Sequence, residues 1–201
     1  MGLGLFNWGA DGLPLDTPLV VLVALGNAVG PWLAVAFLAG SLDRDAHGGA
    51  VAGGTALGTA VLTYYVAGLL GWPGVPAELG QLIAAWLIVA TFGGPLLGAA
   101  GAAWAGGGRY RALGVAILAG GLLAEAAYRF IEVEGWPGID RARTSLQVAT
   151  VDTVVAALLP FTLVDRGRRA SAYLGSAVVG LAGLILFAGV IVAIRAVVFG
   201  G

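Results

Sequence analysis

Six apolar segments, each close to the length that crosses a lipid bilayer, constrain this chain more than any other feature. They lie at about 18–40, 48–71, 79–104, 110–131, 145–164 and 172–199. A transmembrane α-helix needs about 20 consecutive apolar residues, and a helix satisfies its own backbone groups, as hydrocarbon requires. The sequence therefore predicts an all-α, polytopic membrane protein, with an N-terminal interfacial segment at 1–17 and a single six-helix transmembrane domain at 18–201.

The residue composition supports this fold class and adds a packing expectation. Hydrophobic residues make up 59% of the 201 residues and charged residues only 10%, whereas soluble domains carry about 25% charged residues. The 35 glycines predict a compact Gly/Ala-rich bundle, because small residues let helix backbones approach closely in membranes. The small-xxx-small pairs Gly26/Gly30, Gly49/Gly53, Gly54/Gly58 and Gly94/Gly98 fit either packing inside the bundle or docking to a partner membrane subunit.

Several classes of function are excluded or disfavoured by what the chain lacks. All ten basic residues are Arg, there is no Cys, and His47 is the single histidine. These facts exclude a P-loop lysine, disulfides, thiolate metal sites and a histidine-based metal cluster. The net charge of −1 gives no footprint for nucleic acid, and we find no HExxH, Walker A or GxGxxG pattern. We therefore predict no enzyme, no catalytic residues, no metal and no cofactor.

The arginines are distributed unevenly between the loops on the two sides of the predicted bundle. One side holds Arg44, Arg109, Arg111, Arg166, Arg168 and Arg169, and the other holds Arg129, Arg141, Arg143 and Arg195. Arginine-rich loops stay in the cytoplasm. This bias predicts a multi-pass protein of the bacterial cytoplasmic membrane with both termini outside.

Polar side chains inside the predicted spans gather in one half of the membrane. Helices rise about 1.5 Å per residue, so sequence position converts to depth. Asn27 falls close to the midplane, and the outer half receives Tyr64, Tyr65, Trp86, Glu125, Tyr128, Arg129, Asp152 and Arg195. A charge in hydrocarbon costs at least about 2.5–3.5 kcal/mol at mid-span, so we expect these groups to pair or to line a site that water reaches.

Two interpretations of this polar layer remain open. In the first, Glu125 pairs with Arg129 and Asp152 pairs with Arg195, and the cluster locks the helices of a structural or assembly subunit of a larger membrane complex. In the second, the layer surrounds an outward-facing cavity with an aromatic wall that binds a small solute. The two carboxylates would suit a cationic solute, whereas Arg129 and Arg195 would suit an anion, so the sign of its charge stays open.

Three prolines fall inside the predicted spans, at positions 31, 95 and 160. An interior proline removes a hydrogen bond to the carbonyl four residues earlier. Pro31 would thereby free the carbonyl of Asn27, which we expect to contribute to the floor of a cavity. Packing kinks without a functional role are the alternative.

Part of the sequence resembles a bacterial six-helix membrane family of unknown function. The resemblance rests on the run Asn27–Gly40, on Tyr64-Tyr65, on the run Gly94–Trp104 and on Glu125-Ala-Ala-Tyr128. It implies a six-helix inner-membrane protein and carries no activity with it. The layout also resembles, in architecture alone, the substrate-binding S components of energy-coupling-factor vitamin transporters, which have an outward-facing pocket and small-residue faces that dock a coupling subunit.

Overall fold

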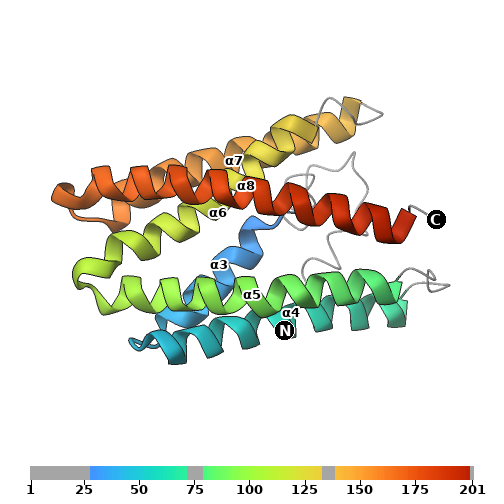
Figure 1. Ribbon diagram of the computed structural model, residues 1–201, viewed down its shortest axis with the longest axis horizontal. Coiled ribbons are helices and arrows are strands. Elements are labelled where there is room, and N and C mark those ends of the chain that lie inside the picture. Colours follow the sequence, from blue (N-terminus) through green and yellow to red (C-terminus); the bar gives the residue numbers. More distant parts are fainter. Residues whose placement is uncertain (1–27, 72–78, 133–138, 200–201) are drawn as a thin grey trace.

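The fold consists of long helices joined by short connections, and a computed structural model describes it for residues 28–71, 79–132 and 139–199. In these ranges the chain forms six α-helices: α3 (Gly30–Ser41), α4 (Ala46–Gly71), α5 (Leu79–Gly106), α6 (Arg111–Glu132), α7 (Ile139–Leu163) and α8 (Arg169–Phe199). Two 3-10 turns, η1 (Gly108–Tyr110) and η3 (Arg166–Arg168), complete the regular structure of these ranges. The predicted all-α class is confirmed (Figure 1).

Five of the helices, α4 to α8, are long and apolar enough to cross a membrane, and α3 is a shorter apolar helix. The helices differ strongly in how much of their most apolar stretch is buried inside the bundle. The buried share is 56% for α6 and 17% for α8. Helix α6 is therefore the central helix, whereas little of this stretch of α8 is buried inside the bundle. Such apolar outer surfaces are consistent with contact with a lipid bilayer, and the chain is a multi-pass membrane protein.

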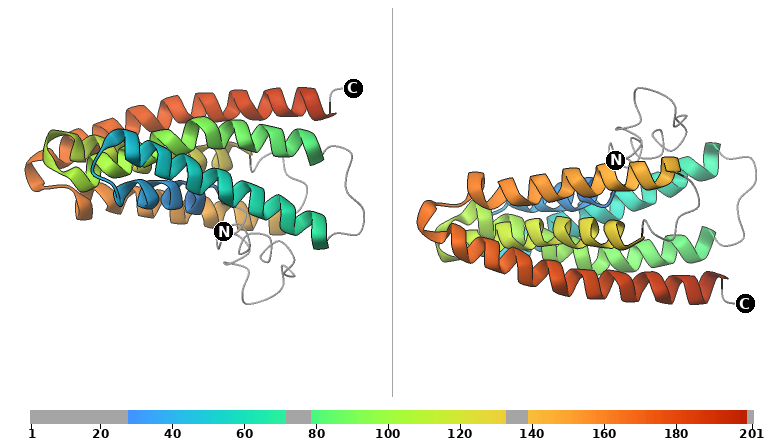
Figure 2. Two further views of the ribbon diagram at one scale, coloured as in Figure 1. Left: turned by 90° about the horizontal axis from the view of Figure 1, so that it is seen from below. Right: turned by 90° about the horizontal axis from the view of Figure 1, so that it is seen from above.

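Helices α3, α4 and α5 form one group, and α6, α7 and α8 form a second group. Helices α3, α4 and α5 contact one another, and α6 contacts α7 on one side and α8 on the other. Figure 2 shows α6 lying between α7 and α8 in the view from above. Contacts of α6 with α3 and α5 join the groups, so residues on α6 reach most of the bundle interior.

Glycines bring α4 and α5 into backbone contact. A Cβ atom added to Gly53 would lie 2.6 Å from the Cα atom of Gly98, and one added to Gly94 would lie 2.8 Å from the Cα atom of Gly54. No side chain fits at such distances, so these positions require glycine. The pairs Gly49/Gly53 and Gly94/Gly98 are thus used for packing inside the bundle, which was one of the two predicted uses.

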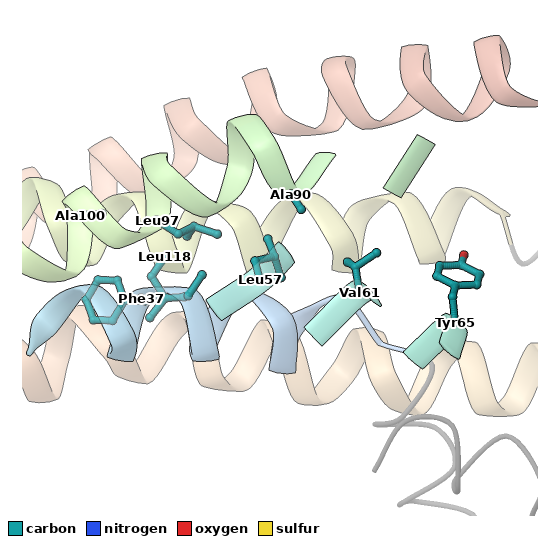
Figure 3. Packing of buried hydrophobic residues seen from close by; sticks show 9 residues of the cluster. Phe37, Leu57, Val61, Tyr65, Ala90, Leu97, Ala100 and Leu118 are labelled. Carbon is teal, nitrogen blue, oxygen red and sulfur yellow. The ribbon is translucent and has the colours of Figure 1, made fainter. Parts of the chain in front are cut away.

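The main apolar core fills the space enclosed by four helices. It contains Phe37 of α3, Leu57, Val61 and Tyr65 of α4, Ala90, Leu97 and Ala100 of α5, and Leu118 of α6 (Figure 3). Close packing of this kind stabilises helices within a membrane, where neighbouring lipid is equally apolar. The core fixes α3 against α4 and α5, and this contact helps to set the position of the start of α3.

Two boundaries differ from the sequence expectation. Helix α7 begins at Ile139, six residues ahead of the predicted span, because polar residues continue the helix beyond its apolar part. Helix α3 begins only at Gly30, and Pro31 lies in its first turn. The prediction that Pro31 lies in a helix interior is therefore wrong, because Pro31 is in the first turn of α3, whereas Pro95 and Pro160 do lie inside helices. Asn27 lies outside the described residues.

Candidate functional site

The start of α3 leaves backbone N–H groups that need partners inside the bundle. The first N–H groups of any helix have no acceptor within the helix. Pro31 has no N–H, which is why proline is tolerated at this place. The amides of Trp32 and Leu33 donate to the carbonyl of Val29, at 2.9 and 3.1 Å. The amides of Val29 and Gly30 are left for a partner outside α3.

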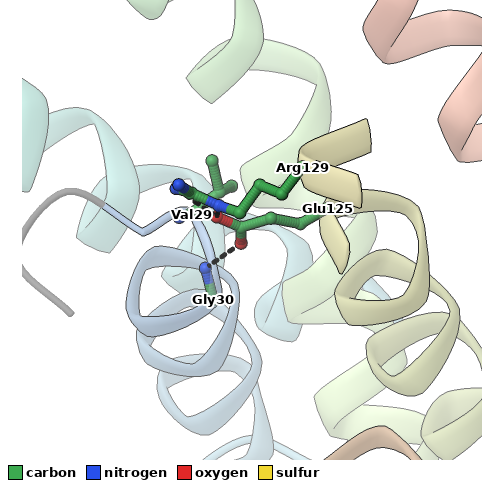
Figure 4. A network of polar contacts seen from close by, with 4 residues as sticks. All are labelled: Val29, Gly30, Glu125 and Arg129. Atoms are coloured by element: carbon green, nitrogen blue, oxygen red, sulfur yellow. Dashed lines mark hydrogen bonds and ion pairs between the residues drawn. The ribbon is translucent and has the colours of Figure 1, made fainter. Parts of the chain in front are cut away.

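Glu125 of α6 supplies that partner. Its Oε1 accepts a hydrogen bond from the amide of Val29 at 2.7 Å, and its Oε2 accepts one from the amide of Gly30 at 2.6 Å. Figure 4 shows the carboxylate facing the first turn of α3. A carboxylate is favourable here because a helix N-terminus carries a partial positive charge. Glu125 therefore caps α3 across 95 residues of sequence.

Arg129 completes the environment of Glu125. Its Nε donates to Oε1 at 2.9 Å, and its Nη2 lies 2.8 Å from the same oxygen. The two residues are one helical turn apart, and this is the pair that their i, i+4 spacing predicts. Because the Glu125 side chain is only 3% exposed, both of its oxygens need these donors: an unpaired buried charge costs several kcal/mol.

Asp152 of α7 lies beside this network and differs from Glu125 in one respect. The residue is 4% exposed, its carboxyl group is within hydrogen-bonding reach of the Glu125 carboxyl group, and its charge interacts with those of Glu125 and Arg129. A Cβ atom added to Gly30 would lie 3.0 Å from its Oδ1, so the carboxyl group faces the start of α3. Its Oδ2 is buried and has no hydrogen-bond partner among the described residues. Such an atom costs about 1–3 kcal/mol or more.

The predicted aromatic wall forms a cluster on the other helix group. Tyr64 and Tyr65 of α4 are in edge contact at 5.0 Å between ring centres, and Trp86 of α5 packs against the same core. Trp32 of α3 joins them, with its ring centre 6.3 Å from that of Tyr64. Sequence reasoning missed Trp32, although it directly follows the proline that starts α3. Helix α3 thus contacts the aromatics through Trp32 and Asp152 through Gly30.

The remaining predicted residues are placed less completely. Tyr128 is half-buried on α6, one residue before Arg129. Arg195 belongs to α8, but its side chain lies outside the description. The pairing of Arg195 with Asp152 therefore stays a prediction. Helix α6 lies between α7, which carries Asp152, and α8, which carries Arg195.

Ser145 is a second polar residue that sequence reasoning missed. It is 4% exposed, and its Oγ is buried without a hydrogen-bond partner among the described residues. It precedes Asp152 by seven residues, which is two helical turns, so both lie on one face of α7. That spacing was the available signal.

We call the group formed by Glu125, Arg129, Asp152 and the backbone of Val29 and Gly30 the acid cluster. It contains two acids and one guanidinium, and its free acceptor is the Oδ2 of Asp152. The described part of the chain contains no group of three or more His, Cys, Asp or Glu side chains that could hold a metal ion. The arrangement can accept a hydrogen bond from a small molecule and can attract a positively charged group.

Comparison with known proteins gives a family and no activity. No protein with a curated description matches the chain, and no solved structure matches it either. The architectural resemblance to the S components of energy-coupling-factor transporters is therefore not confirmed. One family, described as a family of unknown function (DUF6518), matches residues 17–196. Because this match spans most of the chain, and as the resemblance to a six-helix family of unknown function had indicated, the protein belongs to the DUF6518 family.

Proposed function

We propose that this membrane protein binds a small solute at the acid cluster, as a transporter or as the substrate-recognition subunit of one. The observation that carries the proposal is the Oδ2 atom of Asp152, which is buried without a hydrogen-bond partner among the described residues. An ionisable residue inside a membrane span is costly and is commonly functional. A solute that donates a hydrogen bond to this oxygen would remove the cost.

The position of α3 supports the same proposal. In transporters, a helix that starts inside the membrane commonly points its N-terminal end at the bound group. Helix α3 begins at Gly30, beside Asp152. Its partner Glu125 lies about 21 Å along α6 from the start of that helix, so the start of α3 is at the same depth. The chain thus presents a helix start, an unpaired carboxyl oxygen and a guanidinium at one level.

The distribution of arginines supports an orientation. The loops between α3 and α4, α5 and α6, and α7 and α8 lie at one end of the bundle, the arginine end. It carries Arg44, Arg109, Arg111, Arg166, Arg168 and Arg169. We place this end in the cytoplasm of a bacterial cell, with the acid cluster nearer the outside and both termini outside.

A thermal-shift screen on the detergent-solubilised protein tests the proposal. The library contains amines, carboxylates, amino acids, sugars and nucleosides, and a ligand of the folded state raises the melting temperature. We expect one class to raise the melting temperature of the wild type and to have no effect on Asp152→Asn. Asp165→Asn is the matched control, because Asp165 is an exposed acid at the arginine end. If no member shifts the wild type, solute binding at this site is excluded for these classes.

A structural or assembly subunit of a larger membrane complex is the second candidate. The Glu125 network favours it, because Val29, Gly30 and Arg129 satisfy both oxygens of that carboxylate. In that case, substitutions of Glu125 and Asp152 would both lower stability, no solute would raise it, and the protein would co-purify with other membrane subunits from its native membrane. A solute shift that depends on Asp152 separates the two candidates.

A further inference from the structure

We infer that the solute bound at the acid cluster is a monovalent cation with N–H groups, a protonated amine. The inference rests on the proposed function and specifies the charge and the head group of its solute. The sequence leaves this charge open, because carboxylates and arginines occur in the same layer. The contacts of the individual side chains favour one sign.

Arg129 is already used by Glu125. Its Nε and its Nη2 both lie within 2.9 Å of Glu125 Oε1. Its side chain is 17% exposed, so the pair is held largely away from water. An anionic solute would have to compete for this guanidinium with a carboxylate that is fixed one turn away on the same helix. The arginine of the cluster is therefore a poor anion site.

The backbone amides at the start of α3 are used as well. A helix N-terminus is commonly an anion site, but here the amides of Val29 and Gly30 donate to Glu125. A solute carboxylate or phosphate would find this helix end occupied. The two groups of the cluster that attract anions thus both serve the same glutamate.

The charges that remain favour a cation. With both acids ionised, Glu125 and Asp152 contribute two negative charges, and Arg129 contributes one positive charge. The residues that α3 contributes, Gly30–Ser41, include no ionisable side chain. When neither carboxyl group carries a proton, one negative charge is therefore left among these three side chains, and one monovalent cation can take the place of the proton that the two carboxyl groups would otherwise share. Burial of a net charge is unfavourable in an apolar environment, so this balance selects a single positive charge.

Hydrogen bonding selects an amine among the cations. Asp152 Oδ2 needs a donor, and Ser145 Oγ on the same face of α7 has no partner among the described residues either. Buried Ser176 of α8, in contrast, donates to the carbonyl of Ala172 at 2.8 Å. The unpaired atoms of α7 are about 10 Å apart along the helix axis. They mark one polar face, with Ser145 nearer the outer end of the span and Asp152 deeper. A protonated amine carries donors for such oxygens, which a quaternary ammonium lacks.

Three matched series of compounds test the sign and the head group. Primary alkylammonium ions from methyl to octyl, carboxylates of the same chain lengths and the corresponding alcohols are compared at constant ionic strength by melting temperature. Tetramethylammonium tests the need for N–H groups. We expect a saturable rise with the amines alone, and an apparent affinity at least about 10-fold weaker in Asp152→Asn, because that variant removes the charged partner of the amine. Asp165→Asn should respond as the wild type does.

A second variant guards against failure of Asp152→Asn to fold. Gly30→Ala changes no charge, and its added methyl group would lie 3.0 Å from Asp152 Oδ1, so it should weaken the amine effect by crowding the carboxyl group. A rise with carboxylates and not with amines would overturn the inference and leave solute binding intact. An amine effect that both variants retain would also overturn it. If neither these series nor the wider library gives a shift, the proposed function itself fails.

Discussion

Charged side chains at the arginine end of this bundle and in the acid cluster have different kinds of hydrogen-bond partners. At the arginine end, guanidinium groups donate to backbone carbonyls where helices end: Arg111 Nε to Leu163 at 3.0 Å, and Arg169 Nε to Val164 at 3.1 Å. Arg168 also donates to the carbonyl of Gly108 in η1. In the acid cluster a carboxylate performs the converse task, because Glu125 accepts from the amides at the start of α3. Both arrangements complete the ends of helices.

The difference lies in what is left after the helix ends are completed. The arginines that donate at the arginine end are exposed or half-buried, so water can reach their remaining donor groups. The acid cluster is buried, and after Glu125 has been satisfied Asp152 still has an unpaired oxygen. Capping thus accounts for Glu125 and Arg129 and does not account for the Oδ2 atom of Asp152. Function is therefore to be sought first at Asp152.

Removal of Glu125 should have the largest effect on stability. Glu125→Ala leaves two amides at the start of α3 without acceptors and leaves Arg129 as a largely buried charge without this partner. We expect a loss of about 3–5 kcal/mol, the usual effect of breaking a buried ion pair. Unfolding of the purified protein in mixed micelles, followed by circular dichroism, measures it.

Glu125→Gln is the informative companion. The amide oxygen of glutamine can still accept from α3, but the ion pair is lost, so this loss should be smaller than that of Glu125→Ala. Equal stabilities of the wild type and Glu125→Ala would show that α3 does not depend on this cap. The hydrogen bonds of Glu125 would then contribute nothing to the free energy of unfolding, and the proposed difference between the acid cluster and the arginine end would fail.

A substitution at the arginine end should have an intermediate effect. Arg111→Gln removes a charged donor from the carbonyl of Leu163 at the end of α7. A hydrogen bond with one charged partner contributes about 1.5–3 kcal/mol, and because water can replace part of it we expect a loss near the lower limit. Exposed Arg166 at the same end is the control, and Arg166→Gln should leave the unfolding curve unchanged. A larger loss from Arg111→Gln than from Glu125→Ala would reverse the order of the two ends.

The helices were predictable from the sequence, because a run of about 20 apolar residues has few alternatives in a membrane protein. Helices α4, α5, α6 and α8 lie within three residues of the predicted spans at both ends. The pair of Glu125 and Arg129 also followed from sequence, since residues four apart on a helix are neighbours. Periodicity and length are local properties, and they suffice for features of this kind.

The start of α3 was not predictable in the same way. A proline is compatible with the first turn of a helix and, at a cost, with its interior. The choice at Pro31 depends on whether the amides of Val29 and Gly30 find acceptors, and their acceptor is Glu125, far away in the sequence. For the same reason, no local pattern shows that Ser145 and Asp152 have unpaired atoms. The candidate site was thus predicted in its acids and missed in the helix start and the serine.

The smallest predicted effect concerns two buried serines, and here the sign matters more than the size. Ser176→Ala removes a hydrogen bond to the carbonyl of Ala172 and should lower stability by about 0.5 kcal/mol, since the net contribution of a neutral hydrogen bond is small. Ser145→Ala removes a hydroxyl group that is buried without a partner among the described residues. It should therefore raise stability, by up to about 1 kcal/mol.

The same unfolding measurement compares the two serine variants, and the amine series adds a second readout. If Ser145 contacts the solute, Ser145→Ala should gain stability in the absence of amines and respond less to them than the wild type does. Ser176→Ala should show the opposite combination, with lower stability and an unchanged response. A loss of stability in Ser145→Ala would mean that its hydroxyl group has a structural partner. The unpaired polar face of α7 would then be reduced to Asp152.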